Sequence, residues 1–346
     1  MRRASRDGRA LLGVAFGLID CLIDAALATG DLAYDPFLNF AVAQSRILDA
    51  AEAVLNAVYA DRGSLARVHW QRVWTVGSSK RGHMPRAFAA IDPRAQGSVV
   101  AAADLSNLPA FLDLQLAVWS GGYSFSAPEQ RPALDTPVGR RYLDCCDPYF
   151  WDPEVLGEIP LVIAVGTRDP LYPLAASLTY VAGLPGSTRM LFVPNYGHGH
   201  GTIDHVAAFR TLVQRGLAGA PSPRLEASWD LVEGKVTATL RGGEAGLVEL
   251  WCTTSLGPQN TAVRETNAAC EQVAMIPADS PDLRHATWTR HPMASSGPGR
   301  WEASPPASEL SYPACFVRVE TTAGQPLTSG PLLSRALCRA AGLPVE

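Results

Sequence analysis

The sequence has no apolar run long enough to cross a membrane, no block of like charges and no C-x-x-C pair of cysteines. No stretch reaches the roughly 18 uncharged apolar residues that a membrane-spanning helix requires. Lysine and arginine number 29 against 33 acidic residues, so the 346-residue chain has a net charge of -4 and no basic cluster of the kind that binds nucleic acid. We therefore expect a soluble globular protein with neither a membrane span nor a nucleic-acid partner.

The seven cysteines form no C-x-x-C pair, so neither a zinc ribbon nor a thioredoxin-type site is indicated. Three of them, Cys252, Cys270 and Cys315, fall in the strand-rich C-terminal part. Two of these three can form a disulfide if the protein folds in an oxidising compartment, and buried free thiols are the alternative. The sequence alone does not decide the pairing.

The N-terminus superficially resembles a secretory signal, because Met1-Arg2-Arg3 precedes an apolar run from Leu11 to Ile19. However, Asp20 and Asp24 interrupt this run where a cleavage site should be small and neutral. Apolar residues continue at helical spacing through the same stretch. We therefore interpret the segment as a helix rather than an export signal, and the residues themselves leave the localisation unknown.

Strand-like and helix-like segments alternate over the first 220 residues. Between Asp35 and Asp61 apolar residues recur at three- and four-residue steps, which predicts a helix with one apolar face against a sheet. The segments that follow predict strands at 73–76, 98–103, 161–165 and 190–193, and helices that end at 90 or cover 174–184 and 206–217. Such alternation is typical of an α/β fold with a mostly parallel sheet covered by helices.

Two segments depart from this alternation. An aromatic insertion at about 108–158 is expected to be irregular and to cap a pocket; it contains Trp119, Tyr123, Phe125, Tyr149, Phe150 and Trp151. After a seam of small residues and proline at 218–223, the pattern changes to a period of two residues. The sequence predicts an α/β domain at 1–220 and a small antiparallel β-sandwich of the immunoglobulin or fibronectin type at 224–346.

The strongest local motif is Gly77-Ser78-Ser79-Lys80-Arg81-Gly82, between a predicted strand and a predicted helix. In α/β hydrolases the nucleophilic serine lies on such a sharp turn, which requires small neighbours, and the helix N-terminus favours developing negative charge. The usual pattern is G-x-S-x-G, but Arg81 stands at the second glycine position here and glycine follows one residue later. A serine that only caps the helix is the alternative interpretation.

An acid and a histidine follow Ser79 in the order of α/β hydrolases. Asp169 comes directly after one predicted strand and His198 directly after the next. These are the carboxyl ends of strands, where open α/β sheets build their sites. A serine hydroxyl needs a neutral imidazole to take its proton, and the imidazole needs a carboxylate to orient it. The sequence therefore predicts a catalytic triad of Ser79, Asp169 and His198.

The same residues have other interpretations. Asp169 could cap the next helix, and His198 could be an ordinary loop residue. Zinc binding by His198, His200 and His205 is a further alternative, although nothing else in the sequence completes a first shell of ligands. His83, close to Ser79, is expected to pack rather than to act as a base.

Together these motifs resemble the PhoPQ-activated pathogenicity-related protein family, a branch of the α/β-hydrolase superfamily. The family's turn G-x-S-K-R-G is present as Gly77 to Gly82. Further matches are Asp92-Pro93-Arg94, Asp104-Leu105-Ser106-Asn107, Asp147-Pro148-Tyr149, Gly166 to Asp169, and Pro194-Asn195 before His198. The resemblance implies an α/β-hydrolase-like domain followed by a β-sandwich, and relatives that are commonly secreted or periplasmic.

The chain departs from the family before and just after the serine. Family members carry several strands ahead of the helix that resembles Leu22 to Asp31, so these early strands are expected to be missing here. A loop of those strands normally donates one oxyanion N–H, and losing one donor costs about 2.7–4 kcal/mol of transition-state stabilisation. The Lys80 N–H is the expected remaining donor, with positive charge from Lys80 or Arg81. His83-Met84-Pro85 replaces bulkier family residues.

We interpret the chain as a serine hydrolase that cleaves a small-molecule or peptide ester or amide through a Ser79 acyl-enzyme, without a metal or organic cofactor. The alternative is a catalytically silent binding or secreted signalling protein of the same fold, with the strands around Trp251 and Trp288 as its contact surface. The two hypotheses differ in whether the three side chains converge at hydrogen-bonding distance, about 2.6–3.2 Å for each link.

Overall fold

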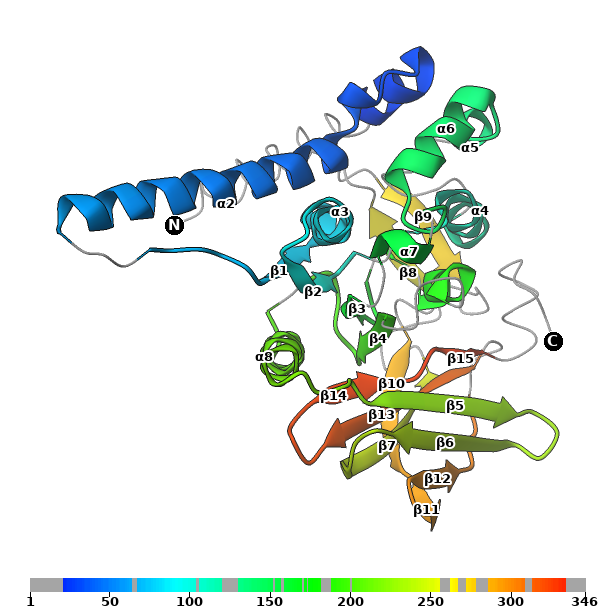
Figure 1. Cartoon of the computed structure of the whole chain (residues 1–346). Coiled ribbons are helices and arrows are strands. Elements are labelled where there is room, and N and C mark those ends of the chain that lie inside the picture. Colours follow the sequence, from blue (N-terminus) through cyan, green and yellow to red (C-terminus); the bar gives the residue numbers. More distant parts are fainter. Residues whose placement is uncertain are drawn as a thin grey trace, which may run out of the picture.

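The parallel and antiparallel parts that the sequence predicts are both present in the computed structural model (Figure 1). The structure describes residues 21–63, 67–103, 106–119, 130–151, 153–156, 159–169, 171–172, 174–181, 188–199, 201–255, 262–266, 272–277, 286–308 and 313–333. Residues 21–29 are helical, as their spacing indicates, and a short 3-10 helix, η1 (Leu32–Tyr34), follows them.

Four parallel strands form the central sheet in the order β1 (Val73–Ser78), β2 (Ala95–Ala101), β3 (Leu161–Gly166) and β4 (Thr188–Val193). All six residues of β3 are buried, which explains why its sequence is continuously apolar rather than alternating. The predicted α/β fold class is confirmed.

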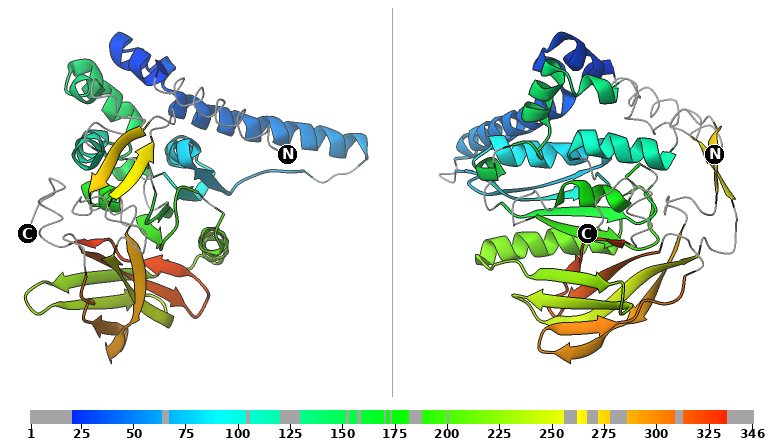
Figure 2. Two further views of the ribbon diagram at one scale, coloured as in Figure 1. Left: turned by 180° about the vertical axis from the view of Figure 1, so that it is seen from behind. Right: turned by 90° about the vertical axis from the view of Figure 1, so that its right-hand side faces the viewer.

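Helices cover both faces of this sheet. Val100 and Ile163 face the side of α4 (Leu108–Trp119), where they join a core that includes Phe111. Alternate residues on the same strands face α8 (Ile203–Ala218) and pack against Leu212. The right-hand view of Figure 2 shows α8 on the face opposite α3 (His83–Ile91) and α4. The period of two residues within each strand divides the core into these two layers.

The long helix α2 (Pro36–Asp61) forms as predicted, but the expectation that it lies against the sheet is wrong. Its N-terminal half packs on α3, which stands between α2 and the sheet; Ala41 is buried there and Leu48 contacts the same cluster. Its C-terminal half projects from the body of the molecule (Figure 1), where the Val54 side chain is 61% exposed.

The described part of the insertion at 108–158 is largely helical, which corrects the expectation of an irregular segment there. It contains α4, α5 (Gln130–Ala133), α6 (Pro137–Cys146) and α7 (Pro153–Leu156). Phe111 and Leu112 are completely buried, so this part of the insertion contributes to the core. Trp151 likewise packs inward and donates its indole N–H to the Cys145 carbonyl. Tyr123 and Phe125, on which the predicted pocket cap partly depends, lie outside the described residues.

The predicted helix at 174–184 is a 3-10 helix, η3 (Leu174–Thr179), over its described part.

After α8 the chain enters two antiparallel sheets. One has the order β11 (Ala294–Gly297), β12 (Arg300–Ala303), β6 (Lys235–Arg241), β5 (Arg224–Asp230). The other contains β10 (Thr287–Pro292), β7 (Ala245–Ser255), β13 (Ala314–Thr321), β14 (Pro326–Thr328) and β15 (Leu332–Leu333). A separate hairpin pairs β8 (Ala262–Thr266) with β9 (Gln272–Pro277).

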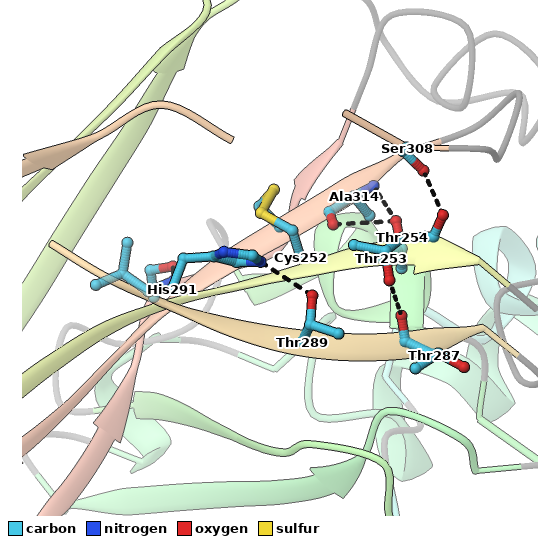
Figure 3. The surroundings of a disulfide bond; sticks show 11 residues. Cys252, Thr253, Thr254, Thr287, Thr289, His291, Ser308 and Ala314 are labelled. Carbon is cyan, nitrogen blue, oxygen red and sulfur yellow. Dashed lines mark hydrogen bonds between the residues drawn. A yellow bond between two sulfur atoms is a disulfide. The ribbon is translucent and has the colours of Figure 1, made fainter. Parts of the chain in front are cut away.

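The two larger antiparallel sheets form a sandwich, because Val236 from one and Leu250 and Val317 from the other share a core. A disulfide joins Cys252 on β7 to Cys315 on β13, which are directly opposite in the strand register (Figure 3). This settles the pairing that the sequence left open for these two residues; Cys270 lies outside the described part of the chain.

The sandwich packs directly against the edge of the parallel sheet at β4. Phe316 lies 5.5 Å from Phe192, ring centre to ring centre, and both belong to one continuous core. Thr328 accepts a hydrogen bond from the Phe192 N–H (3.0 Å) and donates one to the Met190 carbonyl (3.1 Å). The two architectures therefore share buried surface, and their division into domains at 220 and 224 stays a prediction.

Candidate active site

The turn after β1 holds Ser79 in a conformation that few residues adopt. Ser79 has a φ of 54° and begins a 3-10 turn, η2 (Ser79–Gly82), which leads into α3. Gly77 is required here, because a Cβ at this position would overlap the Arg81 carbonyl. A strained residue between a strand and a helix presents its side chain above the sheet, the geometry of the nucleophile elbow.

The three side chains of the predicted triad lie together. Ser79 Oγ is 2.7 Å from His198 Nε2, and His198 Nδ1 is 2.9 Å from Asp169 Oδ2. Asp169 follows β3 and His198 follows β4, so neighbouring parallel strands deliver them to the same edge as Ser79. Both distances fall within the range expected for a nucleophile, its base and an orienting acid.

The Asp169 carboxylate both caps the turn that follows β3 and binds His198. The capping role that was the alternative interpretation therefore accompanies the contact with His198. Oδ1 accepts the N–H groups of Leu171 (2.8 Å) and Tyr172 (3.2 Å), so the side chain caps the turn that follows. Oδ2 remains for His198. The side chain is 0% exposed, against 25% for His198, so the carboxylate is held by its hydrogen bonds while the imidazole still reaches solvent.

Tyr172 is a residue of this site that the sequence analysis missed. Its ring stacks beside the His198 imidazole, with centres 6.0 Å apart and an angle of 26° between the planes. The same ring lies 6.0 Å from Phe111 of α4, which connects the site to the helical insertion. A tyrosine in the turn after Asp169 belongs to no motif, so no local pattern signals its place in the site.

The structure places Lys80 and Arg81, the predicted auxiliary residues, in the same 3-10 turn as Ser79. The Arg81 residue is exposed, and Lys80 is partly buried. Their contribution to an oxyanion site stays a prediction.

Among the residues that the structure describes, no three His, Cys, Asp or Glu side chains are grouped to hold a metal ion, and His200 lies outside them.

Two of the family-like motifs contain buried carboxylates that hold neighbouring groups by hydrogen bonds. The buried Asp147 carboxylate accepts N–H groups of Asn107, Leu108 and Tyr149, which fixes the start of α4, although burial raises the pKa of this carboxyl. Asp92 binds the guanidinium of Arg94, whose hydrogen bond lowers the Asp92 pKa to about 2. These acids are structural rather than parts of the triad.

His83, the residue after the elbow turn, packs against Phe37 of α2 with ring centres 4.4 Å apart, as predicted. Burial lowers the pKa of this imidazole to about 3, and the charge of Arg86 acts in the same direction. The unfolded chain takes up this proton near pH 6.5 and the folded chain does not. Stability is therefore complete above pH 6.5 and is lost as the pH falls toward 3.

We expect His83→Phe to flatten the dependence of unfolding free energy on pH. Between pH 6.5 and 4 the wild-type slope should exceed that of the variant by about 1.4 kcal/mol per pH unit, the value for one proton. Urea unfolding at several pH values measures this. Equal slopes for wild type and His83→Phe would show that His83 protonates freely in the folded state.

Solved structures with partial similarity include acetyl xylan esterase 1 from a Thermoanaerobacterium species, with 19% identity and a TM-score of 0.32 over 43% of this chain and 47% of the other. A puromycin-hydrolysing peptidase of Mycobacterium tuberculosis matches 48% of this chain and 23% of its own, with 17% identity and a TM-score of 0.30. The acylaminoacyl peptidase of Pyrococcus horikoshii matches 47% of this chain over 26% of its own length, with 13% identity and a TM-score of 0.32. The matched regions thus span less than half of these three proteins.

No curated protein matches the sequence. No helix of the described residues is both long and apolar enough to cross a bilayer. A family model, that of the PhoPQ-activated pathogenicity-related proteins, matches residues 38–259, which is more than half of the chain and includes all three residues of the predicted triad. The chain belongs to this family.

Proposed function

We propose that the protein is a serine hydrolase that cleaves an ester or an amide through an acyl-enzyme on Ser79. The observation that carries the proposal is the 2.7 Å contact between Ser79 Oγ and His198 Nε2, made by a serine at a φ of 54° on a strand-to-helix turn. A serine that only capped α3 would have no need of this strained backbone or of a histidine partner.

In the proposed reaction, Ser79 Oγ attacks the acyl carbonyl carbon while its proton passes to His198 Nε2. Asp169 keeps the His198 proton on Nδ1 and stabilises the imidazolium that forms. His198 then protonates the leaving alcohol or amine as its bond to the acyl carbon breaks. A water molecule, deprotonated by His198, then attacks the acyl carbon; the bond from this carbon to Ser79 Oγ breaks, the carboxylic acid leaves, and His198 returns the proton to Ser79 Oγ. The Lys80 N–H, with Lys80 and Arg81 adding positive charge, stabilises the oxyanion.

The substrate is a small-molecule or peptide ester or amide. The chain supplies all the acid–base groups that this reaction needs, so the proposal includes no metal or organic cofactor.

We also propose that residues 1–220 and 224–346 are two domains, of which the first carries the reacting groups. The buried Trp288, 2% exposed, is a core residue and is not available as the contact surface of a binding protein.

Fluorophosphonate labelling tests the proposal, because this reagent reacts with activated serines. We expect wild type to be labelled at Ser79 and Ser79→Ala to lose all labelling. Ser78→Ala is a matched control: it removes the neighbouring hydroxyl of the same turn and should leave labelling intact. Absence of labelling in wild-type protein with a cooperative unfolding transition would contradict the proposal and favour the silent binding protein.

A further inference from the structure

The two loops that carry Asp169 and His198 both reach across to β10, a strand of the sandwich. Asn195 contacts Trp288 on this strand, and Arg168 donates from Nε to the carbonyl of Ala286, just before it (3.1 Å). We infer that the sandwich positions the triad, with Asn195 and Arg168 as positioning residues. This inference rests on the proposed function of Ser79, Asp169 and His198.

Asn195 binds β10 as a neighbouring strand would. Its Nδ2 donates to the Trp288 carbonyl (2.8 Å), and its Oδ1 accepts the Trp288 N–H (3.0 Å). One side-chain amide thus satisfies both backbone groups of a single residue. Asn195 lies three residues before His198 and has a φ of 55°, a left-handed conformation that asparagine tolerates better than most residues. The backbone of the histidine loop is therefore fixed at this position.

The two loops are also tied to each other. The Asn195 N–H donates to Thr167 Oγ1 (2.8 Å), and the Arg168 N–H donates to the Tyr196 carbonyl (2.9 Å). They lie so close that a Cβ at Gly166 would overlap the Tyr196 carbonyl. Because the loops form one unit, a displacement of the Asn195 contact is transmitted to the Asp169 side as well as to His198.

The strand that receives these contacts is itself well anchored. The Trp288 ring is buried and packs 5.2 Å from Phe316, ring centre to ring centre. Next to it, Thr289 pairs in register with Cys252, whose disulfide leads to β13; Figure 3 shows Thr289 and the disulfide on adjacent strands. A positioning contact is useful only when its far end is rigid, and β10 meets this condition.

Adhesion between the two parts of the molecule is the simpler explanation for these contacts, and the structure offers a matched comparison. Arg318 on β13 binds Asp204, near the start of α8, through two hydrogen bonds of 2.9 Å each. This ion pair crosses the same junction but touches neither loop of the triad. If adhesion were the whole role of Asn195, its loss and the loss of Arg318 should have similar effects.

The test compares Asn195→Gly with Arg318→Met by the rate of fluorophosphonate labelling at Ser79. Glycine accepts the left-handed backbone, so Asn195→Gly removes the hydrogen bonds without adding strain. We expect the maximal labelling rate to fall about 10- to 100-fold in Asn195→Gly, the range for a small misplacement of reacting groups, while the reagent concentration for half-maximal rate is unchanged. Arg318→Met should label like wild type even if its thermal stability is lower. Equal labelling rates for Asn195→Gly and wild type would overturn the inference.

A second measurement does not depend on activity. In a bound histidine–carboxylate pair the Nδ1 proton gives a far-downfield NMR resonance, which is lost when the pair opens to solvent. We expect this resonance of His198 in wild type and in Arg318→Met, and its broadening or loss in Asn195→Gly. Its retention in Asn195→Gly would overturn the inference even if wild type does not react with the fluorophosphonate, a result that would count against the proposed function alone.

Discussion

Replacing Asp169 with asparagine should lower the rate of Ser79 acylation by about 10,000-fold, the effect known for removal of the orienting carboxylate in serine hydrolases. In the wild-type site, Asp169 Oδ2 accepts the Nδ1 proton of His198 over 2.9 Å. An amide nitrogen at that place donates instead, so it favours the tautomer that carries its proton on Nε2. That tautomer cannot take the proton of Ser79 Oγ.

The fold should survive this substitution, because the new side chain still has one oxygen. That oxygen can accept the N–H groups of Leu171 and Tyr172, which the Asp169 carboxylate accepts through Oδ1 in the wild-type protein. The cap of the turn after β3 is therefore kept while the contact to His198 changes.

The comparison that isolates the orienting role is Asp113→Asn, the same chemical change at a carboxylate that is 57% exposed and pairs with Arg131 on the surface. Stopped-flow or quenched labelling with the fluorophosphonate gives both rates. Acylation at the wild-type rate in Asp169→Asn would mean that His198 is oriented by something other than this carboxylate.

Removing the disulfide by the double substitution Cys252→Ala and Cys315→Ala should lower the free energy of unfolding by about 4 kcal/mol. The two cysteines are 63 residues apart in sequence, and in the chain-entropy model a crosslink that closes a loop of this length restricts the unfolded chain by about that amount. Both residues are buried in the core of the sandwich, at 1% and 0% exposure. Because both are replaced by alanine, no unpaired thiol is left there.

Equilibrium urea unfolding of the oxidised proteins measures this loss as a lower midpoint. Cys145→Ala is the control, because Cys145 is a free cysteine outside the sandwich and its loss leaves the crosslink in place. Wild type unfolded in the presence of a reductant should resemble the double variant. An unchanged midpoint in the double variant would show that the crosslink adds nothing to stability.

The convergence of the three side chains of the proposed triad could be predicted from sequence because each of these residues directly follows its own strand. Ser79, Asp169 and His198 occupy the ends of β1, β3 and β4, so a correct strand assignment was enough to bring them to one edge of the sheet. Gly77 and Gly166 are local signals of the turns after β1 and β3, because a side chain at either position would overlap nearby backbone atoms.

Other features had no local signal. The periodicity of α2 gives its apolar face but not its partner, which is why the packing of Leu48 on α3 rather than on the sheet was not foreseen. In α4, Phe111, Leu112 and Leu114 are all buried, and a helix buried on several sides loses the periodicity by which helices are recognised. The contact between Asn195 and Trp288 joins residues 93 apart in sequence, beyond the reach of any local pattern.

The junction between β4 and the sandwich also sets an order of events during synthesis. All three residues of the proposed triad emerge from the ribosome before residue 220, whereas β10, β13 and β14 are made after it; these strands cover the β4 edge or contact the triad loops. Contacts so distant in sequence form late in folding. If Ser79, Asp169 and His198 act as proposed, a nascent chain that carries them still lacks β10, β13 and β14, so we expect reactivity at Ser79 to report that the sandwich has folded as well as the parallel sheet.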